Sequence, residues 1–553
     1  MSTLSVRSLC IRYPAQSHWA VDGVTLEVAS GAVTWLTGAL GSGTSTLLLA
    51  MAGLAPRLTG GERSGEVLLD GRDVATLSPL PSGIAYLGPT PALQLSGIAA
   101  TVRDEVAIGP MNLGWPVERI RAAADDAMQR LGVEHLADRA PRALSGGEQQ
   151  RVLLAALAAT APTLWLLDEP FSALDTAGRT RVQQWLRDLA AQEATVVIAC
   201  DEADIMVDIA DRLLVLQHGT LALDGAPTAL LGGDAILATG AATTEAATLA
   251  AAAMMPTPRP LQPASLLAAA GLATPTVTTE AIAAPAVDEP PLLECRDVQF
   301  AYAGGPPVLR GVSVLVRPGE AVGLFGVNGA GKSTLMRLAM ALDHPTAGEV
   351  TVRGLATRGR HPEDFAPAVG FLFQQPERQL FSTSVRAECA VGPRLAGWSG
   401  AQVAEAVARV LAELGLEDVA DEHPYDLPVP RRRLVALAAV LATDPDLLLL
   451  DEPTAALDGT SRTRVAAVVR SRVAQGRAVV AITHDVVFAH EALDRALWLR
   501  EGRIALDAAT RSVLTGGAHQ LPATLQVAMG LGLPPGADRH AAVAAALAQR
   551  RSE

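Results

Sequence analysis

Gly326-Val327-Asn328-Gly329-Ala330-Gly331-Lys332-Ser333-Thr334 is the stretch of sequence that decides the fold of this chain. It matches the P-loop pattern G-x-x-x-x-G-K-[ST], whose glycines let successive backbone N–H groups point at one phosphate. The apolar run 321–325 before it predicts a buried strand, and residues 335–338 after it predict a helix. We therefore expect a nucleotide site in which Lys332 contacts the β- and γ-phosphates and the Ser333 hydroxyl contacts Mg²⁺.

The amino-acid composition supports this prediction. Lys332 is the only lysine among 553 residues. A lone lysine placed at random would fall at that position about once in five hundred chains, so a chance match to the pattern is a poor explanation. Lysine is a compact charge on a thin stem, whereas arginine is a bulky planar fork, and only lysine fits inside a tight ring of amides.

Charge, cysteine usage and hydropathy exclude several classes of function. The net charge of −14 argues against a nucleic-acid surface as the main partner. The four cysteines are scattered without a C-x-x-C pair, which is typical of reduced thiols in a cytosolic protein. Residues 1–10 lack the layout of a secretory signal, and no run of about 18 apolar residues is present. Any membrane-spanning part is therefore expected from other chains.

The chain contains two copies of one sequence unit. Residues 38–46 repeat 326–334 at an offset of 288, and residues 168–170 repeat 451–453 at an offset of 283. Each copy alternates short aliphatic strands with helices, which predicts an α/β domain with a mainly parallel sheet. Helical stretches at 117–131 and 401–414 predict an inserted helical subdomain. We expect a first domain over 1–275, a linker over 276–291 and a second domain over 292–553.

An apolar run that ends in Asp451-Glu452 supplies the second half of a P-loop site. At this distance from a P-loop the pair is a specific signal, although an acidic pair after an aliphatic run is weak alone. We expect Asp451 to hold Mg²⁺ through water and Glu452 to orient or deprotonate the attacking water.

The stretch Leu144-Ser145-Gly146-Gly147-Glu148-Gln149-Gln150-Arg151 resembles the signature motif of ABC-type ATPases, and the resemblance covers nearly the whole chain. It implies two tandem P-loop ABC ATPase domains, each a RecA-like α/β core with an antiparallel β subdomain and an inserted helical subdomain. It also implies that the halves pair head to tail as an internal pseudo-dimer. The signature of one half, here Ser145, Gly146, Gly147 and Glu148, then closes over ATP on the P-loop of the other half.

The same resemblance assigns roles to residues outside these motifs. It implies that Tyr302, like Tyr13 in the first copy, stacks on adenine. It implies that Gln374 lies near Mg²⁺ and the attacking water, and that His484 contacts the γ-phosphate. The cofactors that follow are ATP and Mg²⁺.

The two copies depart from this pattern in complementary places. The first has Thr44, Pro89 and Cys200 where the second has Lys332, Gln374 and His484. The second has residues 427–431, Leu-Pro-Val-Pro-Arg, where the first has its signature. Proline lacks an N–H group, so this segment cannot form an amide cradle. Head-to-tail pairing then predicts one competent composite ATP site and one degenerate site.

The stretch 373–381, Phe-Gln-Gln-Pro-Glu-Arg-Gln-Leu-Phe, with Val391-Gly392-Pro393 and the segment 522–533, resembles the ATPases of energy-coupling factor (ECF) importers. The resemblance implies a peripheral protein on the cytoplasmic face of the cell membrane. Its partners would be an integral-membrane scaffold (T-type) subunit and a substrate-binding (S-type) subunit for a vitamin or transition-metal ion. Two alternatives stay open: a tandem ATPase of a sugar importer, and a ribosome-associated tandem ABC protein.

Overall fold

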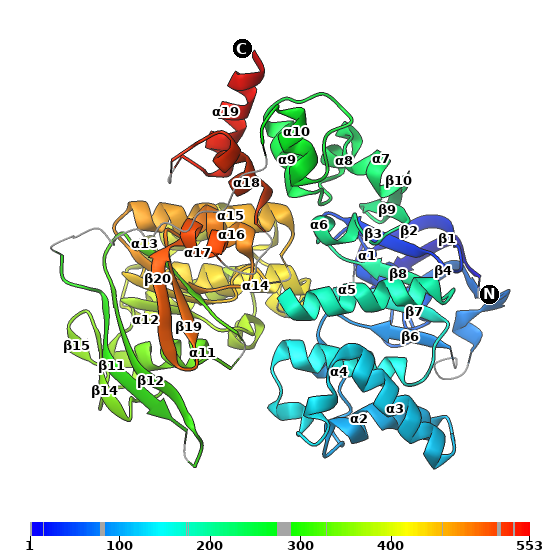
Figure 1. Ribbon diagram of the computed structural model, residues 1–553, viewed down its shortest axis with the longest axis horizontal. Helices are drawn as coiled ribbons and strands as arrows, with labels where there is room; N and C mark the ends of the chain where they lie inside the picture. Colours follow the sequence, from blue (N-terminus) through cyan, green and yellow to red (C-terminus); the bar gives the residue numbers. More distant parts are fainter. Residues whose placement is uncertain are drawn as a thin grey trace. The chain divides into compact units, whose positions relative to one another are not determined.

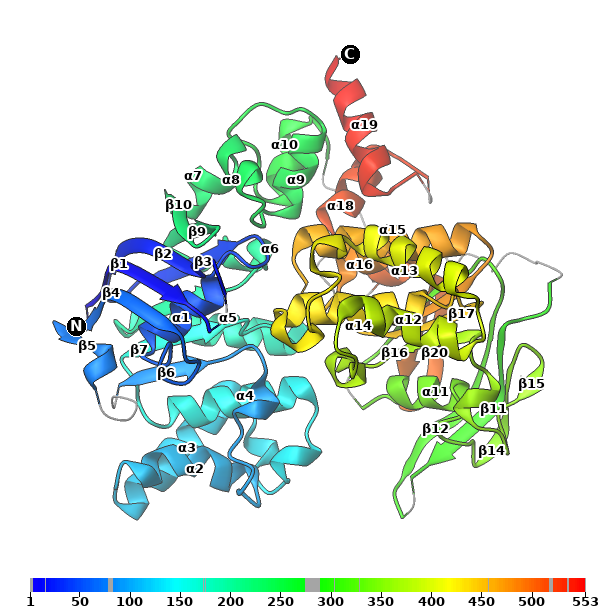
Figure 2. The same ribbon diagram turned by 180° about the vertical axis from the view of Figure 1, so that it is seen from behind.

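The computed structural model describes residues 3–14, 16–77, 83–172, 174, 176–273, 289–302, 304–327, 329–455, 457–516, 521–534 and 537–552. The chain divides into a first unit, Met1–Leu272 with Ala544–Glu553, and a second unit, Ala273–Val543. Figures 1 and 2 show both units from opposite sides. Most of the expected linker 276–291 lies outside the described residues.

A six-stranded sheet forms the centre of the first unit, in the order β10-β9-β3-β8-β7-β6. Its strands are parallel except for β10, which pairs antiparallel with β9. A separate antiparallel sheet has the order β2-β1-β4-β5. The strands are β1 (Leu4–Arg12), β2 (Val21–Val28), β3 (Val33–Gly38), β4 (Glu62–Leu69), β5 (Arg72–Asp73), β6 (Ile84–Leu87), β7 (Leu164–Asp168), β8 (Thr195–Ala199), β9 (Arg212–Gln217) and β10 (Thr220–Gly225).

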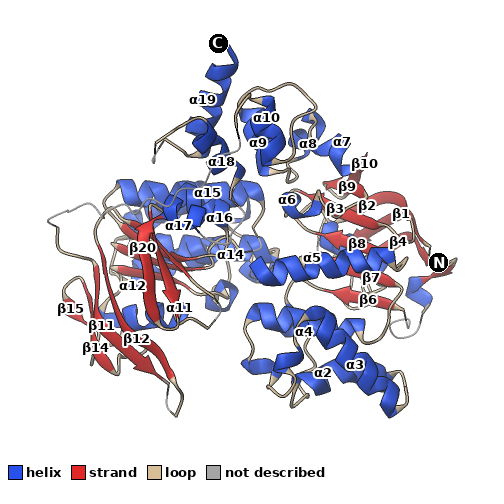
Figure 3. Cartoon of the chain, in the orientation of Figure 1, coloured by secondary structure: helices blue, strands red, loops and turns tan. Residues whose placement is uncertain are grey.

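The second unit repeats this arrangement. Its six-stranded sheet has the order β16-β17-β18-β13-β19-β20, with only β20 antiparallel, and its second sheet has the order β12-β11-β14-β15. Figure 3 shows the two sheets of each unit in red. The strands are β11 (Leu293–Ala301), β12 (Pro307–Val316), β13 (Ala321–Phe325), β14 (Ala347–Val352), β15 (Leu355–Ala356), β16 (Val369–Leu372), β17 (Leu447–Asp451), β18 (Ala478–Ile482), β19 (Arg495–Arg500) and β20 (Arg503–Ala509).

Helices complete each unit. In the first they are α1 (Thr44–Met51), α2 (Val102–Asn112), α3 (Val117–Leu131), α4 (Gly146–Ala158), α5 (Thr176–Ala191), α6 (Ala203–Met206), α7 (Pro227–Leu231), α8 (Asp234–Thr239), α9 (Glu245–Ala252) and α10 (Pro263–Ala269). In the second they are α11 (Lys332–Ala339), α12 (Val385–Leu395), α13 (Gly400–Leu414), α14 (Val429–Leu441), α15 (Gly459–Ala474), α16 (Val486–Ala492), α17 (Thr510–Gly516) and α18 (Ala523–Gly530). The last described helix is α19 (His540–Ser552).

Strand β7 shows why the central sheet is buried on both faces. Its side chains alternate between two apolar clusters: Leu164 and Leu166 pack with the antiparallel sheet and α1, whereas Trp165 and Leu167 pack with the helices on the other face. Every residue of β7 is buried, as expected for a parallel strand covered on both sides. Strand β17, with the sequence Leu-Leu-Leu-Leu-Asp, is buried throughout in the same way.

The inserted helical subdomain consists of α2–α4 in the first unit and α12–α14 in the second. The expected helices at 117–131 and 401–414 are α3 and α13, and each stops at a glycine in the left-handed region, Gly132 and Gly415. The predicted fold class, two tandem α/β units with an antiparallel sheet and a helical insertion, is therefore confirmed. Among the described helices, none has the length and apolar character needed to cross a membrane.

Candidate functional site

The P-loop of the second unit connects β13 to α11 in a conformation that requires glycine. Gly326 and Gly331 have φ values of 145° and 103°, in the region that L-residues rarely adopt. A Cβ atom on Gly326 would lie 2.2 Å from the carbonyl oxygen of Leu499, so no side chain fits there. Gly329 has a φ of 81° with open space around its Cα atom. Asn328 lies outside the described residues.

Lys332 is the first residue of α11 and folds back over its own loop. Its Nζ atom donates to the carbonyl oxygen of Gly326 at 2.7 Å and to that of Val327 at 3.3 Å. Only 8% of the residue is exposed. The ammonium group is thus held inside the P-loop by main-chain acceptors, which a phosphate can replace with charge-assisted hydrogen bonds.

The groups expected to act with the P-loop gather at the carboxyl edge of the parallel sheet. Asp451 ends β17 and Glu452 follows it, His484 follows β18, and Gln374 follows β16. The strand order β16-β17-β18-β13 places these chain positions on neighbouring strands beside the P-loop. Ligands of open α/β sheets bind at this edge.

Ser333 and Asp451 connect the P-loop to β17. The Ser333 hydroxyl donates to Oδ2 of Asp451 at 3.0 Å. Asp451 is 6% exposed, and burial raises the pKa of its carboxyl group, while the hydrogen bond from Ser333 and the charge of Lys332 lower it. A hydroxyl and a carboxylate are hard oxygen donors of the kind that Mg²⁺ prefers.

Glu452 and His484 lie against each other. The backbone N–H of His484 donates to Oε2 of Glu452 at 3.3 Å, and its Nε2 atom lies 3.6 Å from Oε1. Burial and the adjacent charge of Asp451 raise the pKa of Glu452 to about 8. Glu452 also has a φ of 52°, which is uncommon for a residue with a side chain. A carboxyl group with a pKa near neutrality is suited to general-base work.

Tyr302 and Thr334 form a second pair at the P-loop. The Tyr302 hydroxyl lies 3.3 Å from Oγ1 of Thr334, the ring packs edge-on against Phe300, and 48% of the residue is exposed. This leaves a ring available for stacking beside the first turn of α11. Gln374 is exposed and therefore accessible at the sheet edge.

The first unit keeps the shape of its P-loop without the lysine. Gly41 and Gly43 have φ values of 82° and 99°, close to those of Gly329 and Gly331. Thr44 begins α1 at the position of Lys332. The loop geometry is thus retained, whereas the charge that would meet a phosphate is absent from it.

Asp168 occupies the position of Asp451 in the first unit. It is 3% exposed, and within the described part of the chain its Oδ2 atom has no hydrogen-bond partner. Burial raises the pKa of Asp168 to about 7, although a hydrogen bond from Ser45 lowers it.

Strand register places Ala199 with Ile482, so Asp201 stands at the position of His484 and Cys200 at that of Thr483. The expected match of Cys200 to His484 is wrong by one residue, although the first unit still lacks the histidine. Cys200 is 3% exposed, which agrees with the expectation of a small core residue.

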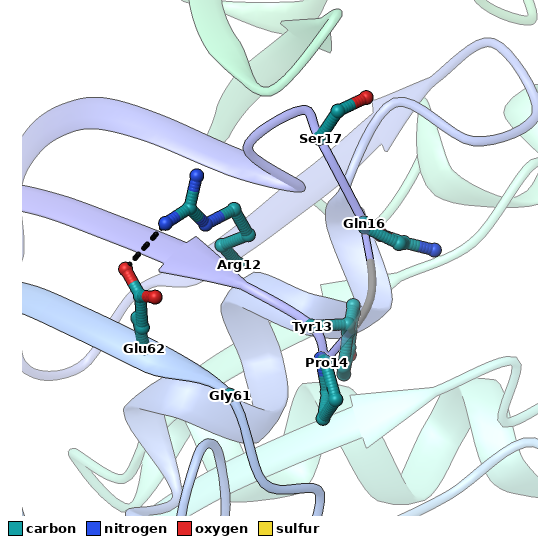
Figure 4. A pocket seen from close by; sticks show the side chains of 7 residues that line it. All are labelled: Arg12, Tyr13, Pro14, Gln16, Ser17, Gly61 and Glu62. Carbon is teal, nitrogen blue, oxygen red and sulfur yellow. Dashed lines mark hydrogen bonds and ion pairs between the residues drawn. The ribbon is translucent and has the colours of Figure 1, made fainter.

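Tyr13 of the first unit resembles Tyr302 in its setting. Its hydroxyl lies 3.0 Å from Oγ1 of Thr46, as that of Tyr302 lies near Thr334. Tyr13 lines a pocket of about 410 Å³, and Figure 4 shows an ion pair of 2.6 Å between Arg12 and Glu62 at the side of this pocket. The first unit therefore retains the aromatic residue although it lacks the lysine.

The signature stretch of the first unit begins α4 through a capping box. The backbone N–H and the hydroxyl of Ser145 each donate to Oε2 of Glu148 at 2.8 Å, and Ser145 Oγ accepts from the Glu148 N–H at 3.4 Å. Gly146 and Gly147 are the first two helical residues. The positive end of the α4 dipole and the Gly146 and Gly147 amides are therefore grouped at one helix start, a setting that suits an anion.

The corresponding helix of the second unit, α14, begins differently. Pro428 is its N-cap, no side chain caps it, and Pro430 follows in its first turn. The capping serine, the glycines and two amide hydrogens are all missing there. The two units therefore differ at the two motifs in opposite senses.

Both units of the chain match one family of known proteins. A family model described as ABC transporter matches residues 21–172 and 309–455. An ABC transporter ATP-binding protein of Bifidobacterium longum is 33% identical over 514 residues, which are 89% of this chain and 64% of that protein, so this chain spans about two thirds of its length. Another, from Streptomyces coelicolor, is 32% identical over 547 residues, 94% of this chain and 96% of that protein. The solved structure of cbiO1 from Clostridium perfringens, described as part of the ABC transporter complex cbiONQ, is 26% identical and covers 41% of this chain and 91% of its own, with a TM-score of 0.38.

Proposed function

The chain belongs to the family of ABC transporter ATP-binding proteins and is thereby an ATPase of a transporter, and from this premise we propose that only one of its two nucleotide sites hydrolyses ATP. The competent site combines the P-loop of the second unit with the signature stretch of the first in a head-to-tail pseudo-dimer. The degenerate site combines the P-loop that has Thr44 with the α14 start that has Pro428.

One observation carries this proposal: each unit keeps the half-site that the other has lost. The second unit has Lys332 in its P-loop and the pair Glu452 and His484 in contact. The first has the capped signature helix at Ser145. Independent decay of two motifs would not be expected to leave one complete set of groups divided between the units in this way.

The residues of the competent site have separate tasks. When ATP binds, the Nζ atom of Lys332 leaves the carbonyl oxygens of Gly326 and Val327 and donates to the β- and γ-phosphates. Glu452 accepts a proton from, or orients, the attacking water, and His484 donates to the γ-phosphate beside it. Tyr302 stacks on the adenine ring, and Ser145 with the Gly146 and Gly147 amides approaches the γ-phosphate from the other unit.

Mg²⁺ fits the oxygen donors at the mouth of the P-loop. Ser333 Oγ and Asp451 Oδ2 are 3.0 Å apart, and Gln374 follows the strand next to β17. No group of three or more His, Cys, Asp or Glu side chains among the described residues could hold a metal, which agrees with an ion that takes most of its ligands from phosphate and water. When bound, the ion neutralises charge that develops on the phosphate oxygens.

Trapping of nucleotide by orthovanadate tests the one-site proposal. Vanadate takes the place of the released phosphate and retains ADP only in a site that has completed hydrolysis. We expect one trapped ADP per chain at saturating ATP, and none after Lys332→Ala. Two trapped ADP molecules per chain would contradict the proposal.

We further propose that both units dock on an integral-membrane scaffold (T-type) subunit of an ECF importer, through the loops that follow β6 and β16. Both loops have the same internal support. Gln94 accepts from the N–H of Gly88 at 2.7 Å and donates to Tyr86, and Gln379 accepts from the N–H of Phe373 at 3.3 Å and donates to Phe371. The first unit thus keeps this loop although it has lost its catalytic groups, as expected for a surface with a separate task.

A buried glutamate also accepts hydrogen bonds from the backbone of each loop, and each loop exposes a large apolar side chain. Glu105 accepts from the N–H of Ser96 at 2.7 Å, and Glu388 accepts from the N–H groups of Phe381 and Ser382 at 3.0 and 2.7 Å. Leu93 is 80% exposed and Phe381 is 73% exposed. Large exposed apolar side chains on well-supported loops are typical of interaction surfaces.

The scaffold would carry a substrate-binding (S-type) subunit for a vitamin or a transition-metal ion, and the chain would work at the cytoplasmic face of the membrane. Co-purification from detergent-solubilised membranes tests this docking. We expect a multi-span membrane protein to purify with the wild-type chain and to be lost from Phe381→Glu, whose basal ATP hydrolysis is retained. Co-sedimentation with ribosomes, unaffected by Phe381→Glu, would contradict it.

A further inference from the structure

We propose that Thr454 and Asp485 form a positioning pair that holds Glu452 against His484 in the second unit. The inference rests on the proposed function, since it concerns the residues assigned there to hydrolysis. Neither residue belongs to a motif singled out in the sequence, and they are 31 positions apart. The pair joins the two turns that carry the reacting side chains, one after β17 and one after β18.

The Asp485 carboxylate is fully engaged. Its Oδ2 atom accepts from the Thr454 hydroxyl at 3.0 Å. Its Oδ1 atom accepts from the N–H of Phe488 at 3.0 Å, and this second bond caps α16. Arg462 lies 3.6 Å from the same Oδ2 atom. The N–H of Asp485 donates in turn to the hydroxyl of Thr483 at 3.0 Å. With both oxygens bonded, the carboxylate has one orientation available.

The Thr454–Asp485 hydrogen bond is placed where it can hold Glu452 and His484 together. Thr454 is two residues after Glu452, and Asp485 is one residue after His484. The Thr454–Asp485 bond therefore lies directly beside the contact in which the His484 N–H meets Oε2 of Glu452 at 3.3 Å. Thr454 is 5% exposed, so water does not readily replace its hydroxyl as the donor. Release of this bond would free the His484 turn to move relative to Glu452.

The first unit supplies an internal comparison in which the pair has been lost. Phe171, with no exposed surface, stands at the position of Thr454. Glu202 stands at the position of Asp485, because Ala199 and Ile482 hold matching register positions beside Asp168 and Asp451. Phe171 has no hydroxyl to donate to it. The acid is therefore retained, whereas its donor in the turn that follows β7 is not.

The arginine partner is kept in both units. Arg179, the counterpart of Arg462, pairs with Glu202 in the first unit, as Arg462 lies near Asp485 in the second, so the threonine is what the first unit lacks. The cross-turn bond is therefore absent from the unit that also lacks the histidine and the P-loop lysine. Capping of α16 is reason enough for a carboxylate at Asp485. Thr454 has no such separate role, and its hydroxyl is needed only where Glu452 and His484 are held together.

Thr454→Val removes the hydroxyl with little change in shape and no change in charge. We expect kcat for ATP hydrolysis to fall about tenfold or more, because misplacement of a reacting group is costly, while the Kd for ATP stays within twofold of wild type. Thr454→Ser, which keeps the donor, should retain kcat within about threefold. Thr454→Ala is made alongside, since it removes the same hydroxyl without adding a methyl group in a buried position.

Thr37→Val is the control, because it removes a buried hydroxyl that donates to Asp201 in the turn after β8 of the first unit and should leave kcat unchanged. The proposal is overturned if Thr454→Val and Thr454→Ala turn over as wild type, if Thr454→Ser is equally impaired, or if Thr37→Val is as damaging. A wild-type chain without turnover would instead count against the proposed function, so the two failures are distinguishable.

Discussion

The Ser333 hydroxyl donates to Oδ2 of Asp451 at 3.0 Å, which joins the first turn of α11 to the end of β17. In the first unit the hydroxyl of Ser45, at the position of Ser333, likewise lowers the pKa of Asp168. The two P-loops thus share their serine–aspartate connection and their glycine conformations. They differ in the lysine, and the predictions that follow depend on this difference.

Lys332→Ala should lower the ATPase rate at least a hundredfold. It removes the charge-assisted hydrogen bonds that we propose Lys332 makes to the β- and γ-phosphates, each worth about 1.5–3 kcal/mol. Thr44→Ala, the matched change in the first P-loop, should leave the rate within about twofold, since a threonine does not reach those phosphates. Release of phosphate by the purified chain measures both. Equal loss in the two variants would mean that both P-loops turn over ATP.

Glu452→Gln should also lower the rate at least a hundredfold, because an amide cannot act as a general base and such groups contribute about 10²–10⁴-fold. Glu169 occupies the corresponding position in the first unit, also at a positive φ, of 53°. Glu169→Gln should nevertheless retain most of the activity. Steady-state rates at saturating Mg²⁺ and ATP compare the variants, and a similar loss from Glu169→Gln would refute a single hydrolytic site.

Ser145→Ala should reduce turnover tenfold or more, because Ser145 both caps α4 and is proposed to meet the γ-phosphate. The lost cap alone costs about 1 kcal/mol of stability. Pro428→Ser, the reciprocal change at the start of α14, should raise stability by about 0.5–1 kcal/mol and leave turnover unchanged. Thermal unfolding and ATPase assays on the same samples separate the two effects. A gain of activity in Pro428→Ser would show that the second signature position is also used.

Asp168→Asn should stabilise the first unit more at pH 8 than at pH 5.5. In the folded unit the pKa of Asp168 is about 7, against an ordinary value of 3.8, so the carboxyl group is largely neutral below pH 7 when folded and ionised above about pH 4 when unfolded. Its burial therefore costs more stability as the pH rises from 4 to 7. The extra gain at pH 8 should be about 2 kcal/mol, measured by denaturant unfolding. An equal gain at both pH values would mean that burial does not perturb this group.

The chain's local architecture is largely predictable from its sequence, because local patterns determine it. The run 321–325 became β13, and residues 117–131 became α3 with the same bounds. The P-loop pattern fixed the positions of Lys332 and Ser333 at the start of α11, since that motif is a strand–loop–helix unit in itself. The capping box of Ser145 and Glu148 follows from their spacing of three.

The contacts that cross between turns could not be predicted in this way. The Thr454–Asp485 hydrogen bond and the hydrogen bond from Phe373 to Gln379 depend on which strands are neighbours and on how each turn leaves its strand. From the sequence we expected Lys332 to contact phosphate. In the structure its Nζ atom donates to the carbonyl oxygens of Gly326 and Val327. These interactions depend on tertiary placement, for which spacing along the chain is not a guide.

The buried ammonium group of Lys332 has a practical consequence for labelling. Apart from the terminal amine it is the chain's only primary amine, and it is 8% exposed with its nitrogen atom held by two carbonyl oxygens. Amine-selective reagents therefore have one lysine target in the whole protein, inside the P-loop proposed to receive the triphosphate. The extent of modification, read from the peptide in which trypsin no longer cleaves after Lys332, would report whether that loop is filled.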